Sequence, residues 1–355
     1  MCVLETDMSE SQNIMNNTNA DKRVQLPVYE MSVILITPDN IDTIYTTIKA
    51  LKRQTVRDKL ELVIVCPLKK DLRLANSDVE CFAGCQLLEI GEITSTAVAR
   101  EAGVRAAKSP VVVFSEDHCF PAATWAEELI KRHCELWTGV GPVVCNANPT
   151  TVVSWANFLI EYGEWIAFKS SGTTHHIPGH NGSYKRDVLL EYGERLAGML
   201  EASSPMQWEM ANKGHSFYIE ANARAYHLNF SKFFASLSHR FYAGRLFAYH
   251  RSRDWSMCKR LLYFIGSPLI PLVRLVKILR TVGQINKNRL IPKMLPILII
   301  LLIFDGVGEM MGYATGKAGR AAHVISDREF HNERFLIEED RKLIRNVDIL
   351  TSQIR

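Results

Sequence analysis

Short, fully apolar runs alternate with amphipathic stretches through residues 31–145, and this alternation constrains the fold more than any other feature of the chain. The runs are MSVILIT, ELVIVC, QLLEI, VVVF and VGPVVCN, and helix-like stretches at 40–53, 94–107 and 123–137 lie between them. Strands that are apolar throughout are typical of a mainly parallel sheet with helices on both faces. The sequence therefore predicts an α/β fold, which we expect to form a single domain over residues 31–230.

Polar residues follow two of these runs, where a parallel sheet would bind its ligand. The first set is Thr37, Pro38, Asp39 and Asn40, and the second is Glu116, Asp117 and His118 within VVVFSEDHCFP. Ligands of open α/β sheets bind outside the carboxyl ends of the strands. Carboxylate and imidazole groups at such a place could hold Mn²⁺ or Mg²⁺ bridging phosphates. Plainer interpretations stay open: a charged turn at 116–118, and a turn with a helix cap at 37–40.

The net charge of +4 hides an uneven distribution of charge. Residues 240–293 contain twelve Lys or Arg and one acid, whereas the rest of the chain has more acids than bases. Within this segment Arg274, Lys277 and Arg280 recur beside Leu, Val and Ile, which is typical of a helix lying in an anionic membrane surface. Because aliphatic residues are interleaved with the cations, we expect a lipid partner and no nucleic acid.

Residues 231–312 are therefore predicted to form basic amphipathic helices associated with a membrane. The longest uncharged run, 294–304, has eleven residues, against roughly 20 for a helix that crosses a bilayer. Gly266, Pro268 and Pro271 interrupt the run before it. This predicts peripheral, monotopic or re-entrant attachment, with a soluble helical subdomain or a dimer interface as the alternative.

The ends of the chain are polar, and the cysteines suggest a reducing compartment. Eight cysteines include no CxxC pair, and the first thirty residues lack the pattern of a signal peptide. We expect a location at the cytoplasmic face of the membrane. Residues 1–30 are predicted to be a disordered tail, and residues 313–355 a polar tail that is partly helical.

Several segments together resemble the family 2 glycosyltransferases of the GT-A fold, of the membrane-associated bacterial type. The segments are VILITPDN, TAVAREAG, VVVFSEDHCFP, PGHNGSYKR and AYHLN, in the family's order and over residues 31–230. The resemblance implies that Glu116 to His118 stands at the family's Asp-x-Asp metal motif. Asp117 and His118 would then contact the nucleotide diphosphate and a bound Mn²⁺ or Mg²⁺, and His227 would complete the metal site.

The same resemblance implies the remaining donor-binding residues. Thr37, Pro38, Asp39 and Asn40 would face the nucleotide, Arg100 and Glu116 would lie near the diphosphate, and His180 and Asn181 would offer hydrogen bonds under the transferred sugar. A purely structural interpretation stays open for two of the candidate residues. His227 also fits a structural histidine in a strand, and Arg100 also fits a solvated helix face.

The chain departs from the family at its catalytic base. An inverting transferase needs a carboxylate that takes the proton of the acceptor hydroxyl, and the expected acidic pair is replaced by MLEASSPMQWEMANKG. Glu201 is the candidate base, although an acid at a helix start is common without catalysis. After ELVIVC, Cys66 and Pro67 also replace an acidic turn.

The hypothesis from sequence is an inverting, metal-dependent glycosyltransferase that moves one sugar from a nucleotide-sugar donor to a membrane-linked acceptor, a lipid or a glycan. The QxxRW signature of processive members is absent. The alternative is a non-catalytic, membrane-associated scaffold that keeps the GT-A fold.

Overall fold

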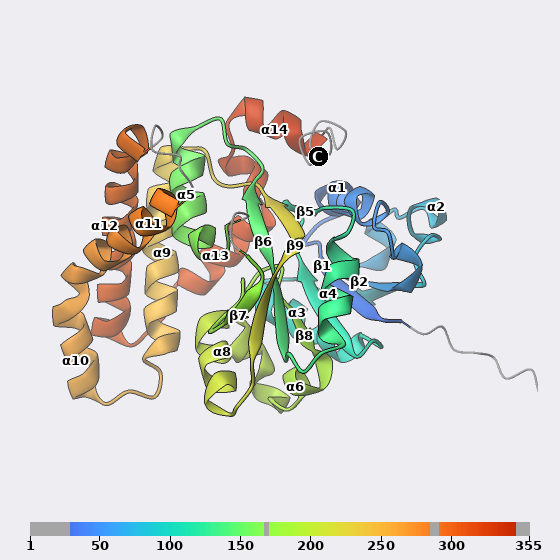
Figure 1. The fold of residues 1–355 in the computed structure, drawn as a ribbon, viewed down its shortest axis with the longest axis horizontal. Helices are drawn as coiled ribbons and strands as arrows, with labels where there is room; N and C mark the ends of the chain where they lie inside the picture. The colour runs from blue at the N-terminus through green and yellow to red at the C-terminus, as the bar shows by residue number, and fades with distance from the viewer. Residues whose placement is uncertain (1–28, 167–169, 285–290, 346–355) are drawn as a thin grey trace, which may run out of the picture.

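The structure is a computed structural model that describes residues 29–166, 170–284 and 291–345 (Figure 1). A mixed sheet forms the centre, and a layer of long helices lies beside it at one end of the molecule. The tail predicted over residues 1–30 lies outside the described residues except for its last two.

The sheet has the order β3-β2-β1-β4-β8-β6-β9-β5, with β7 paired to β9. The strands are β1 (Met31–Ile36), β2 (Leu60–Cys66), β3 (Gly84–Glu89), β4 (Val111–Ser115), β5 (Cys119–Pro121), β6 (Gly139–Asn146), β7 (Gly172–Thr174), β8 (Ser183–Lys185) and β9 (Phe217–His227). β1 to β4 pair in parallel, whereas β8 is antiparallel to both β4 and β6. The α/β fold is confirmed, and its parallel part is extended by a mixed half.

Alternate residues of the parallel strands pack on opposite faces of the sheet. Ile34 and Val63 lie in one core cluster with residues of α3 (Thr96–Ala106). Val33 and Leu62 lie in the other, with α1 (Ile41–Leu51) and α4 (Trp125–His133). Every residue of β2 and β4 is buried, because helices cover both faces. This explains the uniformly apolar runs in the sequence.

Shorter helices connect the mixed half of the sheet. They are α2 (Asn76–Val79), α5 (Val152–Tyr162), α6 (Arg186–Leu190), α7 (Leu196–Leu200) and α8 (Ser203–Asn212). The helical layer consists of α9 (Phe233–Arg251), α10 (Met257–Gly266), α11 (Ile270–Gln284) and α12 (Ile291–Thr315), and is followed by α13 (Ala321–Phe330) and α14 (Glu338–Arg345).

Glycines let α9 and α12 approach closely. A Cβ atom added at Gly244 of α9 would collide with the carbonyl of Asp305, and one added at Gly308 of α12 would collide with the carbonyl of Phe241. Small residues that allow two helix backbones to touch in this way are typical of tightly packed helix pairs. One side of α12 therefore packs closely against α9.

Two helical segments are long and apolar enough to cross a membrane, by length and composition only: Met257–Gly283 and Ile291–Thr315. The sequence predicts that the uncharged run 294–304 is too short to cross a membrane. The helix that contains this run is longer than the run itself, because it continues through Asp305 and Glu309 to Thr315. Their carboxylates are buried near Arg274, so charged residues need not end the helix. The sequence breaks at Gly266 and Pro268 become one short 3₁₀ turn, and helical structure resumes at Ile270.

The residues after 313 pack on the domain. Phe330 and Leu336 are buried, the Thr46 hydroxyl donates to the carbonyl of Ile344 at 2.7 Å, and the buried Asp340 accepts from Asn148 at 2.9 Å. Residues 313–345 thus contain two helices and pack against the α/β domain.

Candidate active site

The pairing of β5 with β9 brings two histidines together. His118 precedes β5, and His227 is the last residue of β9, opposite Cys119 in the register. Leu228 N–H donates to the carbonyl of His118 at 3.0 Å, and the two imidazole rings are 4.8 Å apart with their planes at 71°. Two residues that are 109 positions apart in the sequence therefore share one buried site at the carboxyl end of β4.

Glu116 lies at the centre of this site and is almost fully buried. Its Oε2 accepts from the Asn181 amide at 2.9 Å, and its Oε1 lies 2.7 Å from His180 Nδ1. Burial would raise the pKa of Glu116, but His180 and His118 hold this pKa well below its usual range. The carboxylate is therefore ionised, and its Oε2 lies 3.7 Å from His227 Nε2.

Asp117 orients His118. The Asp117 carboxylate lies 2.5 Å from His118 Nδ1, so that His118 Nε2 faces Glu116 at 4.0 Å and Glu329 at 3.7 Å. Burial would lower the pKa of His118, but Glu116 and Asp117 raise it to about 10. A bound cation would displace this proton, as metal binding does at other imidazoles.

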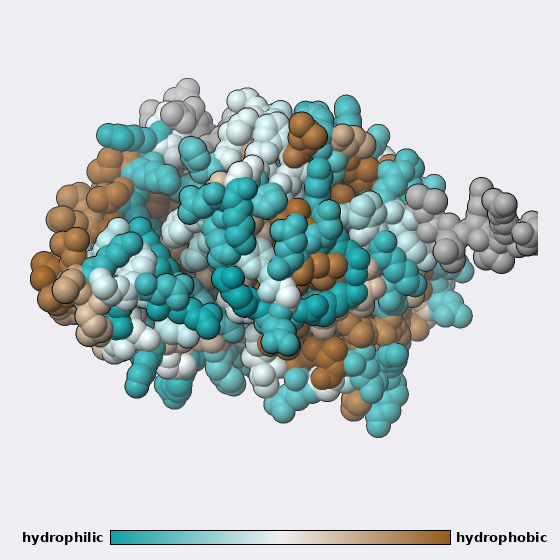
Figure 2. All heavy atoms as spheres, turned by 90° about the horizontal axis from the view of Figure 1, so that it is seen from below, coloured by the Kyte–Doolittle hydropathy of each residue, from teal (hydrophilic) through white to brown (hydrophobic). Residues whose placement is uncertain are grey.

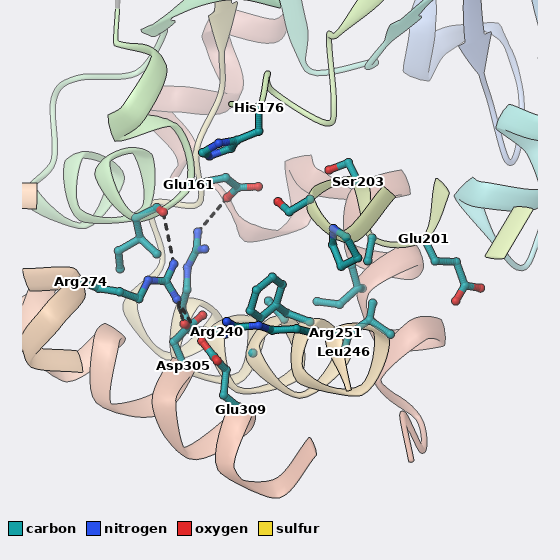
Figure 3. A pocket seen from close by; sticks show the side chains of 18 of the residues that line it. Glu161, His176, Glu201, Ser203, Arg240, Leu246, Arg251, Arg274, Asp305 and Glu309 are labelled. Carbon is teal, nitrogen blue, oxygen red and sulfur yellow. Dashed lines mark hydrogen bonds and ion pairs between the residues drawn. The ribbon is translucent and has the colours of Figure 1, made fainter. Parts of the chain in front are cut away.

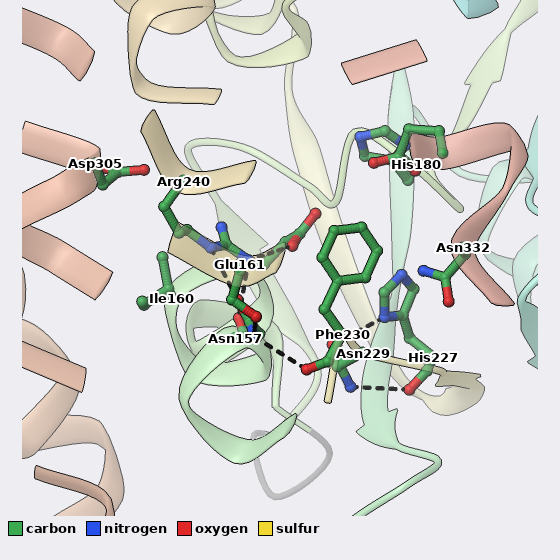
Figure 4. A network of polar contacts seen from close by, with 12 residues as sticks. Asn157, Ile160, Glu161, His180, His227, Asn229, Phe230, Arg240, Asp305 and Asn332 are labelled. Atoms are coloured by element: carbon green, nitrogen blue, oxygen red, sulfur yellow. Dashed lines mark hydrogen bonds and ion pairs between the residues drawn. The ribbon is translucent and has the colours of Figure 1, made fainter. Parts of the chain in front are cut away.

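His227 directs one ring nitrogen at Asn229 (Figure 4), and its other ring nitrogen, Nε2, faces Glu116. Its Nδ1 lies 2.9 Å from Asn229 Oδ1, and the Asn229 amide donates elsewhere, to Asn146 and to the His227 carbonyl. Nδ1 must therefore carry the proton, which leaves a lone pair on Nε2. Burial lowers the pKa of His227 to about 4, so the ring is neutral at pH 7.

These groups fit a divalent cation. Ligand atoms of Glu116, His118 and His227 all lie within 4.8 Å of one another, and so do those of Glu116, His180 and Glu329. Each of the first three has an outer hydrogen-bond partner that fixes its orientation, as metal ligands commonly do. The predicted metal set was Asp117, His118 and His227, whereas the structure places Glu116 in the cluster and Asp117 behind His118.

A strand-end cleft of about 540 Å³ lies beside this site, at the ends of β1 and β2. Pro38 and Asp39 line it, together with Pro67, Leu68 and residues 91–94. Thr37 and Asn40 hold the loop instead: the Thr37 hydroxyl donates to the Asn40 carbonyl at 2.6 Å, and Asn40 Oδ1 caps α1 by accepting from Asp42 N–H at 2.8 Å. Asn40 therefore caps a helix and Asp39 lines the cleft, and the contact of these residues with a nucleotide stays a prediction.

A larger helix-side cavity of about 940 Å³ opens on the other side (Figure 3). Arg100, His180 and Glu329 line its inner end, and Leu262, Leu269 and Val273 of the helical layer line its outer end. Arg100 from α3 lies over the Phe114 ring at 5.3 Å and contacts His180 Nδ1 at 2.9 Å. The inner residues are thus shared between the cavity and the cluster.

Glu201 lines the helix-side cavity, but its carboxylate lies 3.0 Å from His250 Nε2 of α9. Figure 3 shows this side chain directed away from Glu161 and Arg240. Ser203 is the residue that reaches the loop of His180, because a Cβ at Gly179 would collide with the Ser203 hydroxyl. Asn181 adopts a φ of 68° in this tight loop, a conformation that asparagine tolerates better than most residues.

Glu329 is the residue that sequence reasoning missed. It belongs to α13, outside the predicted domain, and partial burial of its carboxyl group raises the pKa of Glu329 to about 7. The segment AAHVISDREF has no catalytic signature. Only the chain path, which returns α13 to the sheet, places Glu329 beside His118.

The folded site defines an α/β enzyme with a cluster suited to a divalent cation at the carboxyl ends of its strands. Residues 32–193 match the family model described as "Glycosyl transferase family 2". Over these residues the α/β domain is similar to the family 2 glycosyltransferases, and this match supports a glycosyltransferase, as the sequence motifs predicted. No curated protein matches the sequence.

Two solved structures are similar in fold at low identity. One is GalNAc-T7 with UDP, GalNAc and Mn²⁺, at 12% identity and a TM-score of 0.43, covering 64% of this chain and 47% of that chain. The other is the mannosyltransferase PcManGT from Pyrobaculum calidifontis in complex with GDP-Man and Mn²⁺, at 16% identity and a TM-score of 0.42, covering 92% and 87%. The chain thus spans about half the length of the first.

Proposed function

We propose that this protein transfers one sugar, with inversion, from a nucleotide-sugar donor to a membrane-linked acceptor, using Mn²⁺ or Mg²⁺. The observation that carries the proposal is the position of the buried cluster Glu116, His118 and His227. It lies at the carboxyl end of β4, beside the strand-end cleft and the helix-side cavity. A transferase needs this arrangement, because donor and acceptor must reach one point from two sides.

The strand-end cleft suits the nucleotide. Pro38 and Asp39 line it at the end of β1, while Thr37 and Asn40 fix the shape of their loop. Arg100 and His180, which line the inner end of the helix-side cavity, and the buried Asn181 would meet the diphosphate and the sugar beside the cluster. Arg100 is buried and meets no carboxylate among the described ion pairs, so its charge remains available for phosphate.

The cation would be held by Glu116, His118 and His227, with Asp117 supporting His118. When bound, it would neutralise charge on the departing nucleoside diphosphate. One carboxylate and two imidazoles suit Mn²⁺ better than Mg²⁺, which prefers oxygen ligands throughout. The residues of the chain supply orientation: Asn229 fixes the tautomer of His227, and Asp117 that of His118.

The helical layer would place the site next to the membrane that carries the acceptor. Apolar side chains at the left edge of Figure 2, where Figure 1 places α10 to α12, form an exposed surface. It includes Leu261, Leu262, Ile265, Leu269, Leu272 and Val273, each more than half exposed. Such a surface on a helical run that is 11% buried supports contact with a bilayer, which we place at the cytoplasmic face as part of the proposal. The same helices line the outer end of the helix-side cavity.

The predicted basic stripe is divided between two roles. Arg274 pairs with Asp305, and Lys277 pairs with Glu164, so these two cations stabilise the helical layer. Arg280 is exposed and would contact anionic headgroups together with Lys259, which is also exposed and lies over the Trp255 ring at 4.2 Å. Membrane attraction would therefore depend on fewer charges than the sequence pattern indicates.

The test is release of nucleoside diphosphate from a panel of UDP, GDP and dTDP sugars with Mn²⁺ or Mg²⁺. We expect release from one donor, and its loss in His118→Ala and His227→Ala. His215→Ala is the matched control, because His215 precedes the opposite end of β9 and contacts Thr138 at 3.0 Å. Silence with every donor, together with no nucleotide binding by calorimetry, would favour the scaffold instead.

A further inference from the structure

Helix α13 separates the two cavities although it lies outside the matched domain. One set of its residues, Ala322, Ile325, Ser326 and Glu329, lines the helix-side cavity, and another, His323, Asp327 and Phe330, lines the strand-end cleft. The first set follows the pattern i, i+3, i+4, i+7 and the second the pattern i, i+4, i+7, so each set occupies its own face of the helix. One helix therefore forms a wall of both cavities.

Glu329 lies where these walls meet the cluster. Its carboxylate is 3.7 Å from His118 Nε2, and 14% of its side chain is exposed. It lines the helix-side cavity and also the small pocket between His118, His227 and Asn332. Within the part of the chain that the structure describes, no arginine or lysine pairs with Glu329.

Most of the other carboxylates that line the helix-side cavity pair with an arginine or a lysine: Glu161 with Arg240, Glu164 with Lys277, and Asp305 and Glu309 with Arg274. Glu201 and Glu329 have histidine partners instead, His250 at 3.0 Å and His118 at 3.7 Å. A carboxylate held by an arginine or lysine is a weak proton acceptor, because the cation stabilises its ionised form. Of these two carboxylates, only Glu329 lies beside the cluster, since it lines the small pocket with His118 and His227, whereas Glu201 lies against His250 of α9.

We infer that Glu329 is the catalytic base: its carboxylate receives the proton of the acceptor hydroxyl. The hydroxyl oxygen forms a bond to the anomeric carbon, the bond from that carbon to the nucleoside diphosphate breaks with its electron pair, and the proton moves to Glu329. This inference rests on the proposed function. It assigns the base to α13, because Glu201, at the place where the family's base is expected, lies against His250 and not against the cluster.

The experiment measures donor hydrolysis, in which water takes the place of the acceptor, for the full chain with Mn²⁺ and the donor found active. Glu329→Gln should lower turnover by at least about 100-fold, the usual contribution of a general base, with Mn²⁺ and nucleoside diphosphate affinities unchanged by calorimetry. Formate should restore part of the turnover of Glu329→Ala, which a purely structural defect would not allow.

Two variants serve as comparisons. Glu333→Gln removes an exposed carboxylate from the same segment and should leave turnover unchanged, whereas Glu201→Gln should retain most of it. Full turnover in Glu329→Gln would overturn the inference, and so would a tenfold loss of Mn²⁺ affinity, which would make Glu329 a metal ligand. A wild-type protein silent with every donor would overturn the proposed function, and this role with it.

Discussion

The α/β domain and the helical layer differ in how their buried polar side chains are arranged. In the domain, Glu116, His118 and His227 converge on one point with their ring nitrogens and carboxylate oxygens facing each other. In the helical layer, Arg274, Asp305 and Glu309 are paired with one another. Groups that converge on one point can still bind a ligand, whereas groups that are paired with one another hold helices together. The comparison therefore distinguishes the residues that bind the cation from those that stabilise the fold.

The largest effect should follow removal of the cation. Chelation by EDTA should lower donor turnover by at least about 100-fold, since the charge that stabilises the leaving group is lost. Added Mn²⁺ should restore the activity of the wild-type protein but not that of His118→Ala. The measurement is nucleoside diphosphate release before and after dialysis. Turnover that survives chelation would show that the cluster has no metal role.

Asp117→Asn should show whether Asp117 orients His118 or binds the cation itself. Loss of the carboxylate behind His118 should weaken Mn²⁺ binding by about 10 to 100-fold, the usual cost of losing an outer partner of a metal ligand. Calorimetric titration with Mn²⁺ measures this directly. An effect as large as that of His118→Ala would instead place Asp117 among the ligands, as the sequence predicted.

Gly244→Ala should test support in the helical layer. The added methyl group collides with the Asp305 carbonyl, and we expect a loss of about 1 to 3 kcal/mol in unfolding free energy. Urea denaturation in detergent provides the measurement. Gly266→Ala is the matched control, because a Cβ there meets nothing within 4 Å. Equal stability of the two variants would contradict the close α9 and α12 packing.

Membrane binding should depend on the exposed face of α10 and α11. Leu272→Asp, at an exposed leucine of α11, should reduce binding to phosphatidylglycerol vesicles about tenfold or more, because a buried leucine contributes about 1.5 to 3 kcal/mol. Leu136→Asp changes a leucine that is 90% exposed on the α/β domain and should leave vesicle binding unchanged. Equal losses in both variants, measured by sedimentation, would remove α10 and α11 from the interface.

The smallest effect concerns acid stability. Burial would raise the pKa of Glu161, but Arg240 and neighbouring histidines lower it to about 2. Because the folded pKa lies below the unfolded one, the stabilisation is complete above about pH 5 and is lost as the pH falls toward 2. Wild-type protein should therefore lose more stability than Glu161→Gln over this window. Parallel pH curves would show that the pair contributes nothing.

The sequence predicted what local patterns determine. Apolar runs identified the strands, and polar residues after β1 and β4 identified the edge of the sheet that carries the site. Which neighbour faces the cation was beyond reach, because Glu116 and Asp117 are adjacent and only the turn before β5 decides their directions. The pairing of Lys277 with Glu164 depends on helix packing across more than 100 residues. The position of Glu329 beside His118 depends on how the chain brings α13 back to the sheet.

Anomalous scattering from crystals soaked with Mn²⁺ and the active nucleoside diphosphate tests the central claim most directly. At the manganese edge, we predict a peak between the Glu116 carboxylate, His118 Nε2 and His227 Nε2, with the diphosphate oxygens completing its coordination. A peak away from these three atoms, or a bound nucleotide without any peak in the cluster, would contradict the account.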